Sequence, residues 1–369
     1  MLPGRARLPA SLRRARRARA RGLVVLGWLA LGVLPQAGCG DGRPSESLGP
    51  ADGPVPGVSP AAPAGAGLSA FRFRSDPGGV RSVIPLEQVQ QGIPGPAPRD
   101  RIPALLEPRL VDLAEARHVR QDERVLVFVA GDEAHAYPVR MLDAHELVND
   151  RVGGVPVLVT WCPLCSSAAA FDRRVAGAER TFGVSGFLWR SDVLMYDHAS
   201  ETFWSQVGAR AVVGPLAGTP LGLLPLESMS LAAFAAAWPH GRVLGPVQAG
   251  RSPADYLRDP YAAYRAQPGL MFDSGPLDGR LPAKEEVLGI AHGGAAWAVP
   301  LARLRAGPPG PWTVQVGGAR WTVHDDPVHD RVRVLDAAGA LAPAWRCAWF
   351  AWAAFHPGTE LAREAPAAR

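Results

Sequence analysis

The sequence predicts a mainly β protein of the α+β class, built from two repeat-related β-rich modules with short helices. Hydrophobic residues make up 47% of the chain and charged residues 20%, which is typical of a globular protein with a buried core. Short runs rich in Val, Leu, Ile and Trp alternate with turns that contain Gly or Pro, and this pattern predicts strands. An internal repeat indicates that these strands form two modules.

The repeat joins two stretches of 18 residues, 125–142 and 287–304, which align without gaps and are identical at seven positions. Each copy predicts a strand, a glycine-containing turn, a second strand and the start of a helix near a proline. Further along, VGGVPVLVTW (152–161) matches VGGARWTVHD (316–325), which predicts another turn that leads into an alternating strand.

The two modules are expected to span residues 76–240 and 241–369. The second is expected to open with a short connecting helix in RDPYAAYRAQ (258–267), where Tyr261 and Tyr264 stand three residues apart and face the same side.

The N-terminal segment predicts export. The first 22 residues contain eight arginines and no acidic residue, and an apolar run follows from Gly22 to Leu34. A basic segment, a short apolar segment and an exit of small residues form the pattern of an export signal, which we expect over residues 1–38. The apolar run is shorter than the roughly 20 residues that a membrane-spanning helix needs.

The sequence QAGC, which ends at Cys39, resembles a bacterial lipobox, in which the cysteine is lipidated and becomes the new N-terminus. Gln36 departs from the aliphatic residue that is usual there. Residues 39–75 are rich in Gly, Pro and Ala and predict a flexible tether. We therefore expect an extracytoplasmic, membrane-anchored lipoprotein of the cell envelope.

The net charge of +5 belongs to the arginine-rich N-terminus. Without its eight arginines the chain has 31 basic and 34 acidic residues. The body of the protein is therefore slightly acidic, which argues against a nucleic-acid partner.

The stretch VTWCPLCSSAAAFDR (159–173) contains a Cys-x-x-Cys pair. The repeat places Cys162 opposite Asp326 and Cys165 opposite His329, in a stretch whose pattern predicts a β-hairpin. By analogy, C-P-L-C is expected at the turn of a hairpin. A thioredoxin-like site remains an alternative, in which a helix follows the cysteines and lowers the thiol pKa.

Four segments together resemble the bacterial and archaeal family called domain of unknown function 3179: residues 136–173, 181–206, 280–290 and 349–361. The most specific blocks are C-P-L-C and M-Y-D-x-x-(S/T)-x-x-x-W-S-Q. The resemblance covers roughly residues 100–360, and the family's name implies no activity. His198 stands where the resemblance leads us to expect arginine.

Two thiolates at a hairpin turn suit a soft metal ion such as zinc or copper. They provide half of a tetrahedral site, so further ligands are needed. His145 in DAHELVND is the nearest candidate and also matches the family. Weaker candidates are Glu146, Asp150, Asp197 and His198.

Two other interpretations of the cysteine pair remain open. In an oxidising compartment, Cys162 and Cys165 would form a disulfide, which serves as a local clamp or a switch. As reactive thiols they would form a redox centre, or Cys162 would pair with His145 as a nucleophile. Cys347 stands alone in an aromatic run and is expected to be a small buried residue.

Polar and aromatic residues near the hairpin form a candidate pocket for a small ligand. They are Asp172, Arg173, Asp192, Tyr196, Asp197, Trp204 and Gln206. The alternative is that these residues lie on ordinary strands and turns, with Trp204 in the core.

The sequence therefore favours an exported protein that binds a small ligand or a soft metal ion at the Cys-x-x-Cys hairpin. A thiol-based redox enzyme or partner that uses the same cysteines is the first alternative. A structural envelope protein with a local disulfide is the second. The sequence does not decide whether the protein is an enzyme.

Overall fold

A computed structural model describes Phe71, residues 80–308 and residues 310–362, all of which belong to one compact unit, Pro54–Arg369. The predicted export signal, the lipidation site Cys39 and the tether predicted over 39–75 lie outside the described residues, apart from Phe71, which is buried rather than part of a solvated tether. The structure does not divide the two predicted modules, so their boundary stays a prediction. No helix within the described ranges is long and apolar enough to cross a membrane.

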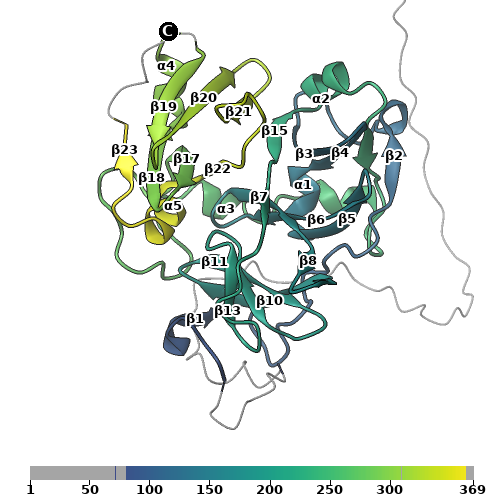
Figure 1. The fold of residues 1–369 in the computed structure, drawn as a ribbon. Coiled ribbons are helices and arrows are strands. Elements are labelled where there is room, and N and C mark those ends of the chain that lie inside the picture. Colours follow the sequence, from purple (N-terminus) through teal and green to yellow (C-terminus); the bar gives the residue numbers. More distant parts are fainter. Residues whose placement is uncertain (1–70, 72–79, 309, 363–369) are drawn as a thin grey trace, which may run out of the picture. The chain divides into compact units, whose positions relative to one another are not determined.

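Strands dominate the described residues, which confirms the predicted mainly β fold with short helices (Figure 1). The helices are α1 (Val139–Leu142), α2 (Leu231–Ala237), α3 (Ala262–Arg265), α4 (Leu301–Ala306) and α5 (Trp349–Phe355). Single 3₁₀ turns occupy Leu86–Gln88, Leu113–Glu115 and Pro253–Tyr256. The predicted connecting helix corresponds to α3.

The five larger sheets are arranged in a ring that resembles a five-bladed β-propeller (Figure 1). The sequence did not indicate this closure. Neighbouring sheets touch through β3 and β4 against β5, β5 against β10, β7 against β22, β17 and β18 against β19, and β21 against β15.

Three sheets come from residues 89–244. The first has the order β15-β3-β4-β16-β2 and contains β15 (Glu227–Ser230), β3 (Arg124–Ala130), β4 (Glu133–Pro138), β16 (Arg242–Leu244) and β2 (Leu110–Asp112). The second has the order β14-β7-β6-β5 and contains β14 (Leu223–Leu224), β7 (Ser167–Asp172), β6 (Val155–Cys162) and β5 (Leu147–Val152).

The third sheet has the order β1-β10-β11-β12-β13 and contains β1 (Val89–Gln91), β10 (Phe182–Trp189), β11 (Asp192–Asp197), β12 (Phe203–Ser205) and β13 (Arg210–Val213). A small separate ribbon of β8 (Arg174–Val175) and β9 (Ala178–Glu179) directly precedes β10. In the chain, β10 to β13 lie between β7 and β14, which pair with each other.

The last two sheets come from residues 286–361. One has the order β22-β17-β18-β23 and contains β22 (Trp345–Ala348), β17 (Glu286–His292), β18 (Ala295–Pro300) and β23 (Glu360–Leu361). The other has the order β19-β20-β21 and contains β19 (Trp312–Val316), β20 (Ala319–Asp326) and β21 (Arg331–Leu335).

The two aligned stretches form the same elements in the same register. In β3–β4 the residue Val125 pairs with Pro138, and in β17–β18 the aligned Val287 pairs with Pro300. Both hairpins lead directly into a short helix, α1 or α4. The correspondence extends beyond the aligned stretches, since β15, α2 and β16 add to the first hairpin as β22, α5 and β23 add to the second.

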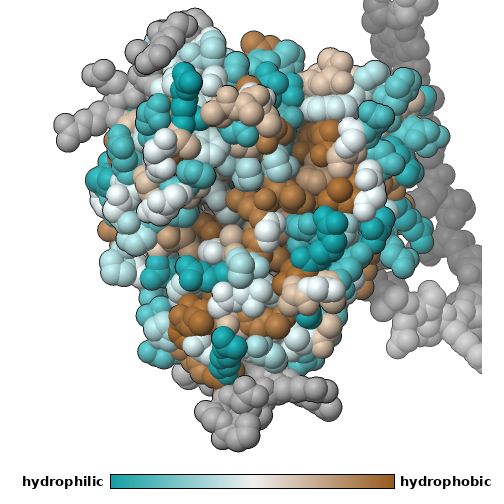
Figure 2. Space-filling model, in the orientation of Figure 1, coloured by the Kyte–Doolittle hydropathy of each residue, from teal (hydrophilic) through white to brown (hydrophobic). Residues whose placement is uncertain are grey.

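Strand β6 positions the cysteines because it is buried along almost its whole length. Its β-branched and apolar residues pack on both faces, as is typical of a strand inside a packed fold. On one side it pairs with β5 and on the other with β7. Hydrophobic surface gathers toward the middle of the face in Figure 2, around the positions of β15 and β7 in Figure 1.

Candidate functional site

The Cys-x-x-Cys pair lies at a hairpin turn, as predicted. Strand β6 ends at Cys162, strand β7 begins at Ser167, and these two residues pair across the hairpin. The alanine-rich segment after the cysteines is strand β7 rather than a helix. A thioredoxin-like site would need a helix there, so the structure does not support that alternative.

The turn itself has the same shape in both copies of the repeat. Ser166 closes the four-residue turn with a φ of 48°, and the aligned Asp330 has a φ of 50°. Asp326 and His329, which align with the two cysteines, contain no thiol and pair with each other. His329 Nδ1 and Asp326 Oδ2 lie 2.6 Å apart in a partly exposed pair.

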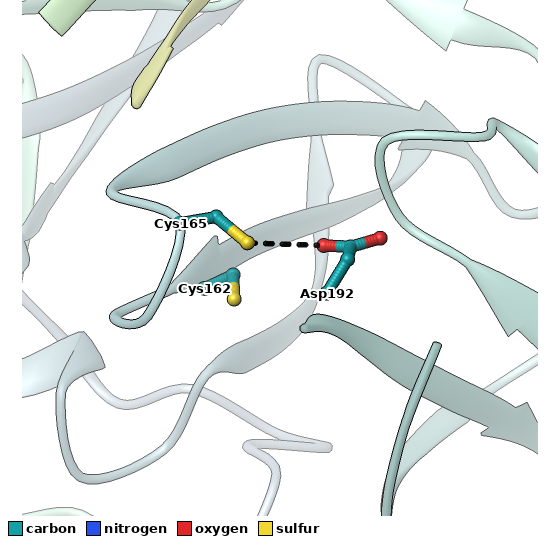
Figure 3. Close-up of side chains that lie close together, drawn as sticks. All are labelled: Cys162, Cys165 and Asp192. Atoms are coloured by element: carbon teal, nitrogen blue, oxygen red, sulfur yellow. Dashed lines mark hydrogen bonds between the residues drawn. The ribbon is translucent and has the colours of Figure 1, made fainter. Parts of the chain in front are cut away.

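Asp192 joins the two cysteines from a different sheet (Figure 3). The sulfur atoms of Cys162 and Cys165 and a carboxylate oxygen of Asp192 all lie within 4.8 Å of one another, and all three residues are buried. We call this group the dithiol centre. Asp192 begins β11 after a two-residue turn, Arg190 and Ser191, in which both residues have positive φ.

Hydrogen bonds fix the Asp192 carboxyl beside Cys165. The Cys165 thiol lies 3.8 Å from Asp192 Oδ1 and 3.3 Å from the carbonyl oxygen of Ser191. The other carboxylate oxygen accepts hydrogen bonds from the Val207 amide, at 3.0 Å, and the Ser205 hydroxyl, at 3.3 Å. The protein therefore holds Asp192 Oδ2 in place, while Oδ1 faces the Cys165 thiol.

Burial dominates the electrostatics of the dithiol centre. Desolvation raises the pKa of Cys165 well above its ordinary value, and the neighbouring Cys162 and Asp192 add to this rise. Desolvation also raises the pKa of Asp192 to about 7, against the hydrogen bonds from Val207 and Ser205 that favour its charged form. The centre therefore favours a neutral Cys165 thiol beside a carboxyl that ionises near neutral pH.

Glu146 is a second buried acid close to this centre. It is 6% exposed, and its side chain makes no hydrogen bond or ion pair to the described part of the chain. Burial raises the pKa of Glu146 to about 8, and the charges of Asp143 and Asp192 add to the rise. Its backbone has a φ of 57° and is held by a hydrogen bond from the Trp161 amide to the Glu146 carbonyl.

Glu146 lines a cavity of about 260 Å³, which we call the Glu146 cavity. Its other polar side chains are Arg101 and Tyr261. The rest of the wall is mainly apolar: Gly92, Ile93, Pro94, Ile102, Leu164, Val184, Gly186, Phe187, Leu188, Val193, Met271 and Phe272. Leu164 is the turn residue directly before Cys165.

The structure does not bring His145 into the dithiol centre. Its Nδ1 lies 2.8 Å from the Pro103 carbonyl oxygen and its Nε2 lies 2.8 Å from the Tyr256 hydroxyl. A carbonyl only accepts, so Nδ1 carries the proton and Nε2 accepts from Tyr256. Burial lowers the pKa of His145 to about 4, which keeps the ring neutral. Its role as a metal ligand stays a prediction.

Gln206, another residue predicted to bind a ligand, hydrogen-bonds to both strands of the cysteine hairpin. Its side chain donates to Thr160 Oγ1 at 2.8 Å and accepts from Ser167 Oγ at 2.6 Å. It therefore ties the third sheet to both strands of the hairpin, just beside Cys162.

The remaining candidates lie elsewhere. Tyr196 donates to Asp100, and Asp197 forms an ion pair with Arg180 at 2.9 Å and accepts from the Trp204 indole at 3.1 Å. At the far end of β7, Asp172 pairs with Arg174. Arg173 is buried and donates to the carbonyl oxygens of Val157, Arg180 and Asp150.

Asp192 was among the residues predicted to form a ligand pocket near the hairpin, but nothing in the sequence grouped its carboxyl with the two sulfur atoms, because it lies on the third sheet, which has no counterpart in the second copy of the repeat. Glu146 was only a weaker candidate ligand beside His145. Tyr261 was assigned to a connecting helix. A buried acid next to a histidine in one motif is the feature that could have drawn attention to Glu146.

Cys162, Cys165 and Asp192 are the described residues whose donor atoms could hold a metal ion together. Two sulfurs and one oxygen suit zinc, with a fourth position left for another ligand. The hydroxyl of Ser191 is also buried and has no hydrogen-bond partner within the described residues. The donor set therefore fits a soft ion, and it equally fits a pair of reactive thiols.

Comparison with known proteins identifies one family. The sequence model of the family described as "Protein of unknown function (DUF3179)" matches residues 99–340, which is more than half of the chain. No curated protein and no solved structure matches the chain.

Proposed function

Because the chain belongs to the DUF3179 family of proteins of unknown function, we propose its function from the site: it is a dithiol redox protein. Cys162 and Cys165 reduce an acceptor that contains a weak S–S or O–O bond, and they form a disulfide with each other. The observation that carries this proposal is the contact between the buried Cys165 thiol and the buried Asp192 carboxyl.

The chemistry needs a base for Cys165. A thiol attacks only as its thiolate, and burial disfavours the thiolate of Cys165. Asp192, whose pKa is raised to about 7, is ionised in a large fraction of molecules near neutral pH and can accept the proton. The carboxyl that faces the thiol is therefore matched to this proton transfer.

The reaction has two steps. Cys162 loses its proton and attacks the acceptor, whose weak bond breaks, and the leaving group departs with a proton. Cys165 then gives its proton to Asp192 and attacks the sulfur of Cys162, which expels the second half of the acceptor. That half takes the proton from Asp192. Two thiols become one disulfide, and the acceptor gains two electrons and two protons.

The test counts thiols by intact mass before and after treatment with an oxidant. We expect the wild-type protein to lose two hydrogen atoms and to recover them after mild reduction. Cys162→Ser and Cys165→Ser should abolish this change, while Cys347→Ser, which removes the third described cysteine, should preserve it. Asp192→Asn should slow disulfide formation by about 10²-fold. Thiols that stay reduced in the wild type would contradict the proposal.

Soft-metal binding is the second candidate, and it rests on the three donor atoms within 4.8 Å of one another. It predicts one zinc or copper ion per chain in protein purified without chelator, lost in Cys165→Ser and kept in Cys347→Ser. Elemental analysis of the same samples separates the candidates, since a bound ion would protect the two thiols from oxidation. The redox proposal expects metal well below one ion per chain.

The proposal includes a location in the cell envelope. The arginine-rich segment, the apolar run and Cys39 in QAGC support export and a lipid anchor. A dithiol that alternates with a disulfide also fits a compartment in which disulfides persist.

A further inference from the structure

Two polar side chains line the Glu146 cavity and make no hydrogen bond to the described residues: the Glu146 carboxyl and the Tyr261 hydroxyl. Glu146 is 6% exposed, and Tyr261 is half-buried. Buried polar groups are normally hydrogen-bonded, because leaving one unpaired costs free energy. Both groups are therefore available to a molecule that enters the cavity.

The oxygen atoms of these two side chains face open space. Within the described part of the chain, the side-chain atoms that are fully enclosed and unpartnered include none from Glu146 or Tyr261. Burial raises the pKa of Tyr261 and the charge of Glu146 adds to this rise, which places the two groups within range of each other. One small molecule in the cavity can therefore reach both.

The backbone around the cavity is irregular in two places. Strand β10 bulges between Val184 and Phe187, and Gly186 within the bulge has a φ of 79°. All three residues line the cavity. Bulges are common beside binding sites, where they redirect a strand. Glu146 itself has a φ of 57°, a conformation that costs free energy in any residue except glycine. Both departures from regular geometry thus occur at the cavity.

The surroundings of Glu146 suit an organic molecule better than a metal ion. Among the described residues, Glu146 belongs to no group of three or more side chains whose donor atoms could hold an ion together. The neighbouring His145 uses both of its ring nitrogens in hydrogen bonds. The rest of the cavity wall is mainly apolar, whereas a metal site needs several ligand atoms.

The walls limit the kind of molecule that fits. A mainly apolar cavity of about 260 Å³ admits a small organic molecule. Glu146 and Arg101, which form ions of opposite sign, both line it, so a ligand with a single charge of either sign meets a like charge there. An uncharged ligand avoids this repulsion.

The two unpaired groups indicate which polar group the ligand carries. A carboxyl accepts a hydrogen bond whether or not it holds a proton, and a tyrosine hydroxyl both donates and accepts. A hydroxyl on the ligand can therefore donate to Glu146 and accept from Tyr261. This match holds for either protonation state of Glu146.

We infer that the Glu146 cavity binds a small, uncharged and mainly apolar alcohol or phenol, whose hydroxyl donates to the Glu146 carboxyl. Neither cysteine lines the cavity. The site is therefore separate from the dithiol centre and does not depend on the proposed redox function.

The experiment measures binding of two probes of similar size to the full chain by equilibrium dialysis. One probe is 2-naphthol, and the other is 2-methylnaphthalene, which has a methyl group in place of the hydroxyl. Hydrophobic transfer out of water by itself favours the methyl compound. We expect the wild type to bind one 2-naphthol per chain about tenfold more tightly than 2-methylnaphthalene, because only the hydroxyl pairs with the buried carboxyl.

Variants of Glu146 test its role. Glu146→Leu removes the acceptor and should reverse the preference, so that 2-methylnaphthalene binds more tightly. This variant is expected to fold, because an apolar side chain replaces a buried polar group that makes no hydrogen bond to the described residues. Glu146→Gln keeps an acceptor oxygen and should keep the preference for 2-naphthol. The exposed Glu115→Leu is the matched control and should leave both affinities unchanged.

A further variant tests the cavity itself. Ile93→Trp fills the cavity from its partly exposed wall and should abolish the binding of both probes. Leu257→Trp, at a site that is 78% exposed, controls for the added indole and should bind both as the wild type does.

Four results would overturn the inference. Absence of saturable 2-naphthol binding, or equal binding by Ile93→Trp, would show that the cavity is not its site. A preference for 2-naphthol that survives in Glu146→Leu would remove the role of the carboxyl. A metal ion present in the wild type and lost in Glu146→Leu would identify an ion as the partner of Glu146. Neither probe reacts with thiols, so each result leaves the redox proposal standing.

Discussion

Glu146 shows how one buried residue makes stability depend on pH. Its carboxyl has a reference pKa of 4.5 in the unfolded chain and about 8 in the folded protein, because burial penalises the charged form. The groups that face it are Asp143 and Asp192, whose charges raise its pKa further, and Arg101 and Tyr261 across the cavity. The folded state therefore binds this proton far more tightly than the unfolded state does.

The sign of the effect follows from this difference. Between about pH 4.5 and pH 8 the folded protein binds more protons at Glu146, so the free energy of unfolding falls as pH rises through this window. Glu146→Gln is neutral at every pH and should reduce that fall by on the order of 1 kcal/mol per pH unit. Urea denaturation at several pH values measures this change in the free energy of unfolding. If the free energy of unfolding changed equally with pH in the variant and the wild type, the pKa of Glu146 would be the same in the folded and unfolded states.

His145 offers a second test at the scale of one residue. His145→Ala leaves the Pro103 carbonyl and the Tyr256 hydroxyl without the hydrogen bonds that the ring now makes. We expect a loss of about 1–3 kcal/mol in the free energy of unfolding, measured by urea denaturation. Metal content and the thiol count should stay as in the wild type. A variant that folds normally and loses a bound ion would instead establish His145 as a ligand.

At the scale of elements, the two halves share a close approach of backbones. Gly153 and Gly317 occupy aligned positions with φ of 52° and 57°. A Cβ atom at either would lie against the carbonyl oxygen of the preceding hairpin turn, at Ala130 or at the aligned His292. The same contact in both halves supports the interpretation of residues 125–161 and 287–325 as copies of one unit.

This contact predicts a matched pair of effects. Gly153→Ala and Gly317→Ala should each lower the free energy of unfolding by about 2 kcal/mol or more, because both the φ and the space are unfavourable. Gly154→Ala and Gly318→Ala are the controls: their φ is also positive, but nothing lies within 4 Å of the new Cβ. They should cost about 1 kcal/mol. Equal losses at all four positions, measured by denaturation, would mean that the close approach relaxes freely.

The repeat also explains what could be predicted from the sequence. The repeat predicted C-P-L-C at a hairpin turn, because the aligned second copy has a clear strand pattern. The alanine-rich SSAAAFD has no such pattern by itself. Asp192 begins β11 and Gln206 directly follows β12, in a sheet without a counterpart in the second copy, so no alignment within the chain could place them beside Cys162 and Cys165. Histidine is the commoner metal ligand, which drew attention to His145 rather than to Glu146.

At the scale of the whole molecule, the alternation of apolar and polar residues predicts strands but not how the sheets close into a ring. The dithiol centre depends on that closure. The hairpin comes from residues 155–172, Asp192 from the third sheet, and the Ala348 amide of β22 donates to the Cys165 carbonyl at 2.8 Å. The surroundings of the cysteines are thus assembled from segments far apart in the chain, including both halves of the repeat.

Beyond the described residues, the proposed lipid anchor determines where this centre works. The basic segment, the apolar run and QAGC predict that Cys39 becomes a lipidated N-terminus. In an exporting bacterial host, we expect the wild-type protein in the membrane fraction, labelled by radioactive palmitate. Cys39→Ala should lose the label, and Cys347→Ser should keep it.

The effect of Cys39→Ala on membrane binding depends on how many acyl chains hold the protein at the membrane. A single acyl chain binds membranes only weakly, whereas two or more hold a protein stably. Loss of the lipid at Cys39 should therefore move most of the protein away from the membrane if the export signal is still cleaved. An uncleaved apolar segment would keep Cys39→Ala in the membrane at higher mass, and N-terminal sequencing distinguishes the two cases. Wild-type protein that is unlabelled and soluble would refute the anchor while leaving the dithiol chemistry untouched.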